Sequence, residues 1–521
     1  MLRIDRIETA MKLNRSELFR FGTALLFIVG IMLFTSVRAD GGTDGILLVI
    51  AAMIGGYMAM NIGANDVANN VGPAVGSQAI TLTGAILIAA FFEAGGALIA
   101  GGDVVGTIKK GIIDPALIAD RDTFVWLMMA ALLAAAVWLN VATAVGAPVS
   151  TTHSIVGGVL GAGIAASGWN IANWNQVGMI AASWVISPVL GGLIAAMFLY
   201  VIKRTITYKI DVLAAAQKMV PILVAIMAWA FGTYLMLKGV KKLIKVDFPT
   251  ALVIGFALAV VVFLLVRPYV ARATKSLENH KSSVNELFTI PLIFAAALLS
   301  FAHGANDVAN AVGPLAGINE AITGGGVTAK ATIPLWVMAV GAIGISLGLA
   351  LYGPKLIRTV GSEITELDKM RAYCVALAAA ITVIVASQLG LPVSSTHIAV
   401  GGVFGVGFLR EYIKSSYART LQEIRDHHAD DDPDAVEAFV ETFEAADVAT
   451  KGKMLRELKN QTAENRLLAK RERRGLGRVH RVELVKRVLL LRIAAAWVIT
   501  VPLAGILAAI FFFMIRGIMP P

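Results

Sequence analysis

The chain carries the phrase Gly63-Ala64-Asn65-Asp66-Val67-Ala68-Asn69 and repeats it letter for letter as Gly304-Ala305-Asn306-Asp307-Val308-Ala309-Asn310. Each copy lies at the end of a long apolar stretch, and Val-Gly-Pro follows within five residues. An ionised aspartate that faced lipid at such a place would cost several kcal/mol. The repeated acid therefore indicates part of a path for an ion or a substrate.

The sequence around these phrases has the composition of a membrane protein. It is 57% hydrophobic and 15% charged, with a mean hydropathy of +0.75, whereas about 25% of residues are charged in soluble domains. Because about 20 apolar residues cross a bilayer as a helix, the candidate spans are the runs 21–37, 45–62, 81–104, 124–145, 154–168, 176–202, 219–238, 250–267, 285–303, 331–353, 371–390, 397–410 and 488–516. The sequence predicts an all-α polytopic membrane protein with about 12–13 transmembrane segments, of which the two shortest runs are the least certain.

The net charge of +10 does not indicate nucleic-acid binding here. The basic residues lie in loops between apolar runs, which is the pattern of cytoplasmic loops in a membrane protein. We expect a multi-pass protein of the plasma (inner) membrane, with a cytoplasmic N-terminus behind an uncleaved signal anchor. The single cysteine, Cys374, lies in an apolar run and excludes a disulfide framework or a thiolate metal site.

A second pair of phrases shows that the duplication extends through the chain: Gly146-Ala147-Pro148-Val149-Ser150-Thr151-Thr152-His153 and Gly390-Leu391-Pro392-Val393-Ser394-Ser395-Thr396-His397. The two pairs are offset by 241 and 244 positions, so the halves are nearly collinear. Seven apolar runs separate the start of one repeat from the start of the next, and this odd number predicts inverted repeats.

This division gives six segments. They are a basic segment with an extra signal-anchor helix at 1–44, the first transmembrane repeat at 45–202, connecting helices with a cytoplasmic loop at 203–285, the first part of the second repeat at 286–410, a charged cytoplasmic insertion at 411–487, and the last transmembrane helix of the second repeat at 488–521.

The Asn-Asp phrases are suited to binding a cation. Small residues and a nearby Gly-Pro pair predict a broken helix, and in a membrane such a break persists where it lines a cavity or meets a partner. Carboxylate and amide oxygens are hard ligands for a sodium ion, and a carboxylate can also hold a shared proton. The alternative is that the asparagines only cap broken helices and that the aspartates pair with lysine.

The Ser/Thr-His phrases are suited to binding an anion. Proline ends the preceding segment and three hydroxyl residues open an apolar one, which is typical of a helix N-terminus. The free N–H groups and the positive end of the helix dipole attract an oxyanion, and two such ends could converge near the midplane of the membrane. The alternative is ordinary N-capping.

Three histidines and one acid accompany these phrases. His153 and His397 follow the hydroxyls, and His303 immediately precedes the second Asn-Asp phrase. Each is either a hydrogen-bonded interior residue or a neighbour of the site. Glu93 lies in the middle of an apolar run, and an acid at such a position is a functional candidate.

The paired phrases resemble those of the Pit-type inorganic phosphate transporter family, over both halves of the chain outside 1–44 and 411–487. The resemblance implies an inverted-repeat bundle with broken or re-entrant helices at the midplane, often dimeric, that imports phosphate with sodium or protons. Carried over by position, the cation ligands are Asp66, Asn69, Asp307 and Asn310. The substrate-binding residues are Ser150, Thr151, Thr152, Ser394, Ser395 and Thr396, and we place Asn65 and Asn306 with them. Glu93 matches a further acid of the family.

Two features leave alternatives open. Many members carry another acid before the second Ser/Thr phrase, where this chain has Val375-Ala376-Leu377, so the coupling cation is either Na⁺ or H⁺. The family also contains sulfate carriers, which makes a sulfate permease the first alternative. An intramembrane aspartyl hydrolase is a third interpretation, because two membrane acids can share a proton. We expect a transporter rather than an enzyme, with phosphate, the coupling cation and the lipid bilayer as partners, no cofactor beyond that cation, and a possible homodimer.

Overall fold

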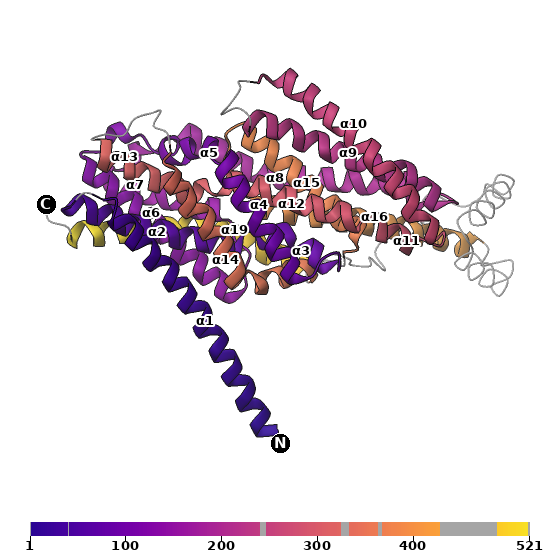
Figure 1. Ribbon diagram of the computed structural model, residues 1–521, viewed down its shortest axis with the longest axis horizontal. Coiled ribbons are helices and arrows are strands. Elements are labelled where there is room, and N and C mark those ends of the chain that lie inside the picture. Colours follow the sequence, from indigo (N-terminus) through magenta and orange to yellow (C-terminus); the bar gives the residue numbers. More distant parts are fainter. Residues whose placement is uncertain are drawn as a thin grey trace.

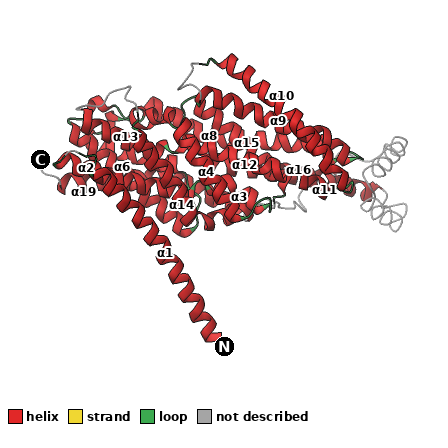
Figure 2. Ribbon diagram, viewed as in Figure 1, coloured by secondary structure: helices red, strands yellow, loops and turns green. Residues whose placement is uncertain are grey.

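The computed structural model describes residues 2–39, 41–239, 246–324, 333–362, 367–427 and 487–518. This described part is almost entirely helical (Figures 1 and 2). The greater part of the predicted insertion at 411–487, from 428 to 486, lies outside the described residues. Within them, eleven helices are long and apolar enough to cross a membrane. The prediction of an all-α polytopic membrane protein is therefore confirmed.

The described residues form the following helices, in chain order. In the first half they are α1 (Leu2–Ser36), α2 (Thr43–Asn65), α3 (Ala68–Gly76), α4 (Leu82–Ala100), α5 (Gly102–Gly106), α6 (Arg121–Val145), α7 (Thr151–Ser167) and α8 (Trp174–Ile202). Then come α9 (Val212–Lys238), α10 (Phe248–Ala273), α11 (Lys281–Leu287), α12 (Thr289–Asp307), α13 (Ala309–Gly324), α14 (Leu335–Ser362), α15 (Lys369–Gln388), α16 (Ser395–His427) and α19 (Arg487–Ile518). Figure 1 shows an elongated bundle from which α1 projects, with α9 and α10 along one flank.

The two shortest apolar runs of the sequence form the helices that matter most for the site. The run 154–168 lies in α7, which has 17 residues, and the run 397–410 lies in the first half of α16. Neither helix is among the eleven candidate spans. Each instead begins directly at the Ser/Thr-His phrase of its own half.

Each Asn-Asp phrase carries a short interruption of a helix, at its aspartate in the first copy and directly after it in the second. Helix α2 ends at Asn65 and α3 begins at Ala68, so that Asp66 lies in the junction. In the second copy α12 ends at Asp307 and α13 begins at Ala309. The helical hydrogen-bond pattern is interrupted at both copies, while the junction residues Asp66, Val67 and Val308 keep helical dihedral angles. Such junctions release backbone groups from the helical pattern, which places polar groups inside an apolar bundle.

Helices of one half pack against helices of the other half. Helix α2 packs against α14 of the second half, and its counterpart α12 packs against α4 of the first. In the same way α7 packs against α19, and α16 packs against α8. Each of the helices α2, α7, α12 and α16 therefore has its most extensive contact with a helix of the opposite half.

Glycines allow these helices to approach closely. A Cβ atom built on Gly304 of α12 would collide with the carbonyl oxygen of Glu93 on α4, and one built on Gly63 of α2 would collide with the carbonyl oxygen of Ile345 on α14. Small residues at contact points let membrane helices bring their backbones together. The glycine that opens each Asn-Asp phrase therefore fixes the distance between the halves next to each aspartate.

Candidate functional site

The two aspartates meet the hydroxyl phrases of their own halves. The Oγ1 atom of Thr151 donates a hydrogen bond to Oδ2 of Asp66 at 2.5 Å. At the equivalent positions of the second copy, Oγ of Ser395 donates to Oδ2 of Asp307 at 3.2 Å. All four side chains are buried, with exposed fractions of 0 or 1%. The residues predicted to bind the cation and those predicted to bind the anion therefore lie in direct contact.

The last asparagine of each phrase reaches across to the other half. Nδ2 of Asn69 donates to Oγ1 of Thr396 at 2.8 Å. Nδ2 of Asn310 lies 3.1 Å from Oγ1 of Thr151 and 3.2 Å from Oγ1 of Thr152. These reciprocal contacts join both copies of both phrases into one site. Each half therefore contributes side chains to the hydrogen-bond network around the aspartates.

The first asparagine of each phrase holds the loop that leads into the hydroxyl helix. Nδ2 of Asn65 donates to the carbonyl oxygen of Ala147 at 3.1 Å, and its Oδ1 accepts from the N–H of Val149 at 3.1 Å. Nδ2 of Asn306 lies 3.4 Å from the carbonyl oxygen of Leu391 in the equivalent loop and donates to Oγ of Ser387, at the end of α15, at 2.8 Å. Both amides therefore contact the protein itself, and their direct contact with substrate stays a prediction.

The hydroxyl phrases form the predicted helix N-termini. Ser150 is the N-cap of α7, and its Oγ accepts a hydrogen bond from the N–H of His153 at 3.1 Å. Oγ of Ser394 accepts from the N–H of His397 at 3.2 Å. The N-capping alternative therefore accounts for the first hydroxyl of each phrase. The N–H groups of the first helical residues have no acceptor within their own helix, and they remain available to an anion.

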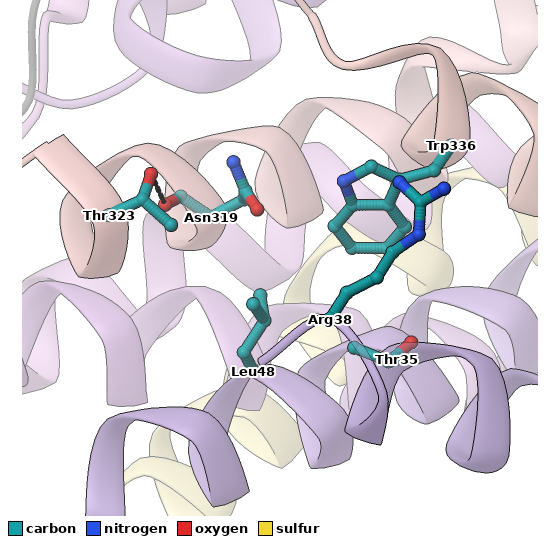
Figure 3. Close-up of a pocket in the computed structure, with 6 residues that line it drawn as sticks. All are labelled: Thr35, Arg38, Leu48, Asn319, Thr323 and Trp336. Atoms are coloured by element: carbon teal, nitrogen blue, oxygen red, sulfur yellow. Dashed lines mark hydrogen bonds between the residues drawn. The ribbon is translucent and has the colours of Figure 1, made fainter. Parts of the chain in front are cut away.

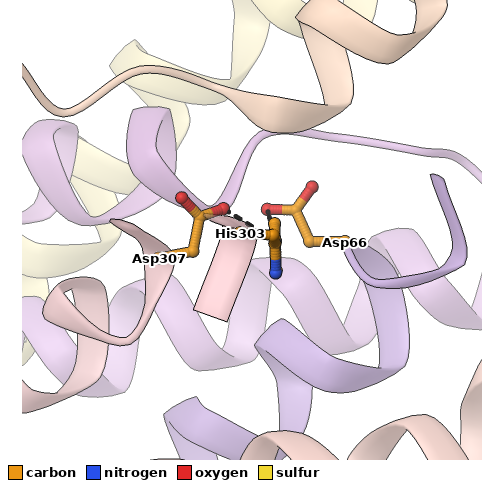
Figure 4. A group of neighbouring side chains, drawn as sticks. All are labelled: Asp66, His303 and Asp307. Carbon is orange, nitrogen blue, oxygen red and sulfur yellow. Dashed lines mark ion pairs between the residues drawn. The ribbon is translucent and has the colours of Figure 1, made fainter. Parts of the chain in front are cut away.

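A histidine connects the three buried acids of the site. Nδ1 of His303 lies 2.7 Å from Oε2 of Glu93, and its Nε2 lies 2.9 Å from Oδ2 of Asp307 and 3.9 Å from Oδ2 of Asp66. Figure 4 shows the imidazole between the two aspartates. Nδ2 of Asn70 donates to the remaining oxygen of Glu93 at 2.8 Å. This arrangement differs from the alternative in which the aspartates pair with lysine.

Several oxygen atoms of this cluster are buried without a hydrogen-bond donor among the described residues. They are Oδ1 of Asp66, Oδ1 of Asp307, and Oδ1 of Asn69 and of Asn70. One ligand atom from each of Asp66, His303 and Asp307 lies within 4.8 Å of the others. A buried oxygen without a donor is costly, and a bound cation would supply the missing partner. The residues present therefore fit a small hard cation.

His153 and His397 form an aromatic cluster with two tryptophans. The ring of His153 lies 3.7 Å from that of Trp184 on α8, and the ring of His397 lies 3.6 Å from that of Trp497 on α19. The two imidazole rings are 4.3 Å apart. The contact between the two imidazoles therefore joins the first turns of α7 and α16, and each histidine also packs on a helix of its own half, α8 or α19.

A comparison with known proteins identifies the family of this chain. Residues 62–508 match the model of the phosphate transporter family. The chain belongs to the phosphate transporter family. It is 53% identical over 518 residues to the protein named "Putative phosphate permease" of Helicobacter pylori strain J99, covering 98% of this chain and 97% of that one. A similarly named protein of Pyrococcus abyssi is 38% identical over 363 residues, covering 70% of this chain and 89% of that one.

A solved structure described as the sodium-dependent phosphate transporter has the same fold. It superposes with a TM-score of 0.73 at 32% identity, and the match covers 91% of this chain and all of that one. The fold therefore supports membership of the phosphate transporter family, as the sequence does.

Some residues around the site of this phosphate transporter family member were not singled out by the sequence patterns. Asn70 is the second residue of an Asn-Asn pair, and only the first asparagine recurs in the other copy. Trp184 and Trp497 lie in apolar runs, where a tryptophan gives no sign of contact with a site. Thr143, which accepts a hydrogen bond from Nδ2 of Asn65 at 3.0 Å, gave no signal except its equivalence to Ser387 in the repeat.

Proposed function

We propose that the chain imports inorganic phosphate by symport with a cation, and that this cation is sodium. The observation that carries the proposal is the set of buried oxygens without donors, on Asp66, Asp307 and Asn69, beside the N-termini of α7 and α16. Carboxylate and amide oxygens are suited to sodium, and helix N-termini are suited to phosphate. Sodium dependence of a protein with the same fold supports this choice over protons.

The coupling follows from the shared hydroxyls. Thr151 and Ser395 each donate to an aspartate, and a cation that takes over the carboxylate frees the hydroxyl to donate to an oxyanion. The positive charge also offsets the charge of the phosphate in a site where no side chain is more than slightly exposed. Each ligand therefore favours binding of the other, which is the requirement for symport.

We further propose that the site opens alternately to the two membrane faces through inverted repeats. The reciprocal contacts of Asn69 and Asn310 support this arrangement. Lysines contact the two equivalent helix hairpins α6–α7 and α15–α16 near their tips: Nζ of Lys355 donates to the carbonyl oxygen of Ala144 at 2.7 Å, and Nζ of Lys238 donates to that of Ser387 at 3.2 Å. Two equivalent hairpin tips held in this way are suited to alternate release.

Phosphate is favoured over sulfate because the site is rich in acceptors as well as donors. Hydrogen phosphate carries a P–OH group that can donate to a buried carboxylate, whereas sulfate has no proton to donate. A site with buried hydrogen-bonding groups rejects an analogue that leaves them unpaired. A carboxylate oxygen of Asp66 or Asp307 that the cation does not bind can accept this hydrogen bond, and the family model and the relatives named phosphate permease support the same cargo.

Uptake of labelled phosphate into proteoliposomes tests the proposed function. We expect accumulation under an inward sodium gradient and little accumulation under an inward proton gradient without sodium. Unlabelled phosphate should compete and equimolar sulfate should not. Uptake driven by the proton gradient alone would replace sodium with protons, and labelled sulfate uptake without phosphate uptake would overturn the choice of cargo.

Substitution of Thr151 tests the shared hydroxyl. Thr151→Val removes the donor to Asp66 and the acceptor of Asn310 while it keeps the shape of the side chain. Because hydrogen bonds to charged groups contribute about 1.5–3 kcal/mol, we expect the concentrations of phosphate and sodium for half-maximal uptake to rise about 10- to 100-fold.

Ser154→Ala is the matched control for this variant. Its buried hydroxyl lies one turn further along α7 and donates to the carbonyl oxygen of Ser150 at 2.8 Å, within its own helix. Uptake by this control should stay close to wild type. An equal loss in both variants would mean that Thr151 acts only on the stability of α7.

A further inference from the structure

A cavity of about 390 Å³ lies away from the Asp66–Asp307 site, where α1 ends. Figure 3 shows it between α1, α2, α13 and α14, and its lining residues are Thr35, Arg38, Leu48, Asn319, Thr323 and Trp336. Asn319 follows Asn310 by nine residues on α13, which is about 13 Å along a helix. The cavity is therefore separate from the site described above.

The cavity has one charged lining residue. This residue is Arg38, whose guanidinium lies 4.5 Å from the centre of the Phe34 ring. Among the described residues the guanidinium forms no ion pair with a carboxylate. Guanidinium groups bind phosphate through a planar array of N–H donors. The cavity therefore presents an uncompensated positive charge, which favours an anion with several oxygen atoms.

A buried hydroxyl in the same cavity also lacks a partner. The side chain of Thr35 is 1% exposed, and its Oγ1 has no hydrogen-bond partner among the described residues. The hydroxyl of Thr323 is already engaged, because it donates to the backbone carbonyl oxygen of Asn319 at 2.8 Å. The side-chain amide of Asn319, which also lines the cavity, is a further donor. One charged donor, Arg38, and two neutral donors, Thr35 and Asn319, around one cavity are suited to bind the oxygen atoms of a phosphate group.

The position of the cavity points to the membrane surface. Arg38 lies two residues after the candidate span Glu17–Ser36, and Trp336 is the second residue of α14. Arginine and tryptophan are both common where a membrane helix meets the headgroup region. The match to the family model begins at residue 62, so α1 and its arginine lie outside the part of the chain that defines the family.

We propose that this cavity binds a phosphate-bearing anion, namely the phosphodiester headgroup of an anionic lipid or free inorganic phosphate. The guanidinium of Arg38 pairs with the phosphate oxygens, and Thr35 and Asn319 donate to them. The volume of 390 Å³ is several times that of a water molecule, about 30 Å³, and leaves room for the glycerol part of a headgroup beside Leu48 and Trp336.

Binding to the delipidated full-length protein tests the proposal and separates the two sources. Native mass spectrometry is used to titrate phosphatidylglycerol and phosphatidylethanolamine, and labelled inorganic phosphate is titrated in parallel. We expect Arg38→Gln to weaken phosphatidylglycerol binding about tenfold, because a charge-assisted contact is lost, and Thr35→Val to weaken it in the same direction. Arg38→Lys should keep part of the affinity.

Two control variants make the result specific. Arg516→Gln removes an exposed arginine near Asp120, and Thr23→Val removes a hydroxyl of α1 that donates to the carbonyl oxygen of Phe19. Both should bind as wild type does. If Arg38→Gln does not fold, Thr35→Val tests the cavity without a change of charge.

The outcomes are distinct. A loss confined to phosphatidylglycerol identifies a lipid headgroup as the source, and loss of a second bound inorganic phosphate identifies the free anion. Equal binding of both ligands by wild type, Arg38→Gln and Thr35→Val would overturn the proposal. Sodium-driven uptake is a separate readout, so failure of this site leaves the transport proposal intact.

Discussion

Asp307→Asn is expected to reduce sodium-driven phosphate uptake at least about 100-fold. The substitution keeps the size of the side chain but removes a charge that Ser395 and His303 contact from two sides. Breaking a buried charged pair typically costs about 3–5 kcal/mol, because the remaining partner is left without compensation, and each 1.4 kcal/mol is a factor of ten in binding. Asp66→Asn should have a loss of the same order.

Sodium binding distinguishes a lost ligand from a damaged fold. In wild-type protein, sodium should raise the melting temperature, because a ligand that binds only the native state stabilises it. We expect this increase to disappear in Asp307→Asn, while the protein still elutes as a single species. Asp211→Asn is the control, because Asp211 caps α9 with an exposed side chain and asparagine caps equally well. Normal uptake by Asp307→Asn would refute the cation site.

Gly304→Val is expected to have a comparably large effect, for a steric reason. Any Cβ at this position meets the carbonyl oxygen of Glu93, which belongs to the backbone of α4 and cannot rotate away. Helices α4 and α12 must then separate, which displaces Glu93 from His303. Overpacking typically costs about 1–3 kcal/mol and occasionally more. We expect a lower melting temperature and uptake near background, with Gly304→Ala in the same direction.

Gly22→Ala is the matched control for this helix contact. Gly22 lies within α1, and a Cβ built there has no neighbour within 4 Å. Alanine is also the better helix former, so stability should be unchanged or slightly higher. A Gly304→Val protein with normal melting and uptake would mean that α4 and α12 tolerate a wider spacing than the structure shows.

The elements of the fold could be predicted from the sequence because each has a local signal. Apolar length indicated the spans, and the Pro-Val-Ser phrases indicated where α7 and α16 begin. The duplication of Asp66 as Asp307 indicated that the two phrases share a function. The aspartates, asparagines and hydroxyls all lie in one cluster, as the repeated pattern suggested. The roles assigned to the individual residues stay predictions.

The contacts across the bundle could not be predicted, because they depend on helix pairing that no local pattern encodes. His303 was marked by its position before the phrase, but its place between Glu93 and Asp307 follows from the packing of α4 on α12. Asn70 contacts Glu93 for the same reason. The cavity at Arg38 needs residues from α1 and α13, which are more than 250 positions apart in the chain.

The packing of helices of the first half against helices of the second half has a consequence for biosynthesis. Helix α7 rests against α19 at Gly157 and Gly161, where its neighbours are Val501 and Gly505. When α7 leaves the ribosome, that neighbouring helix has not been translated, and more than 300 residues must still follow. The nascent α6–α7 hairpin therefore remains in the translocon or the lipid without its packing partner α19. A chain that terminates before α19 lacks the helix against which α7 packs in the finished protein.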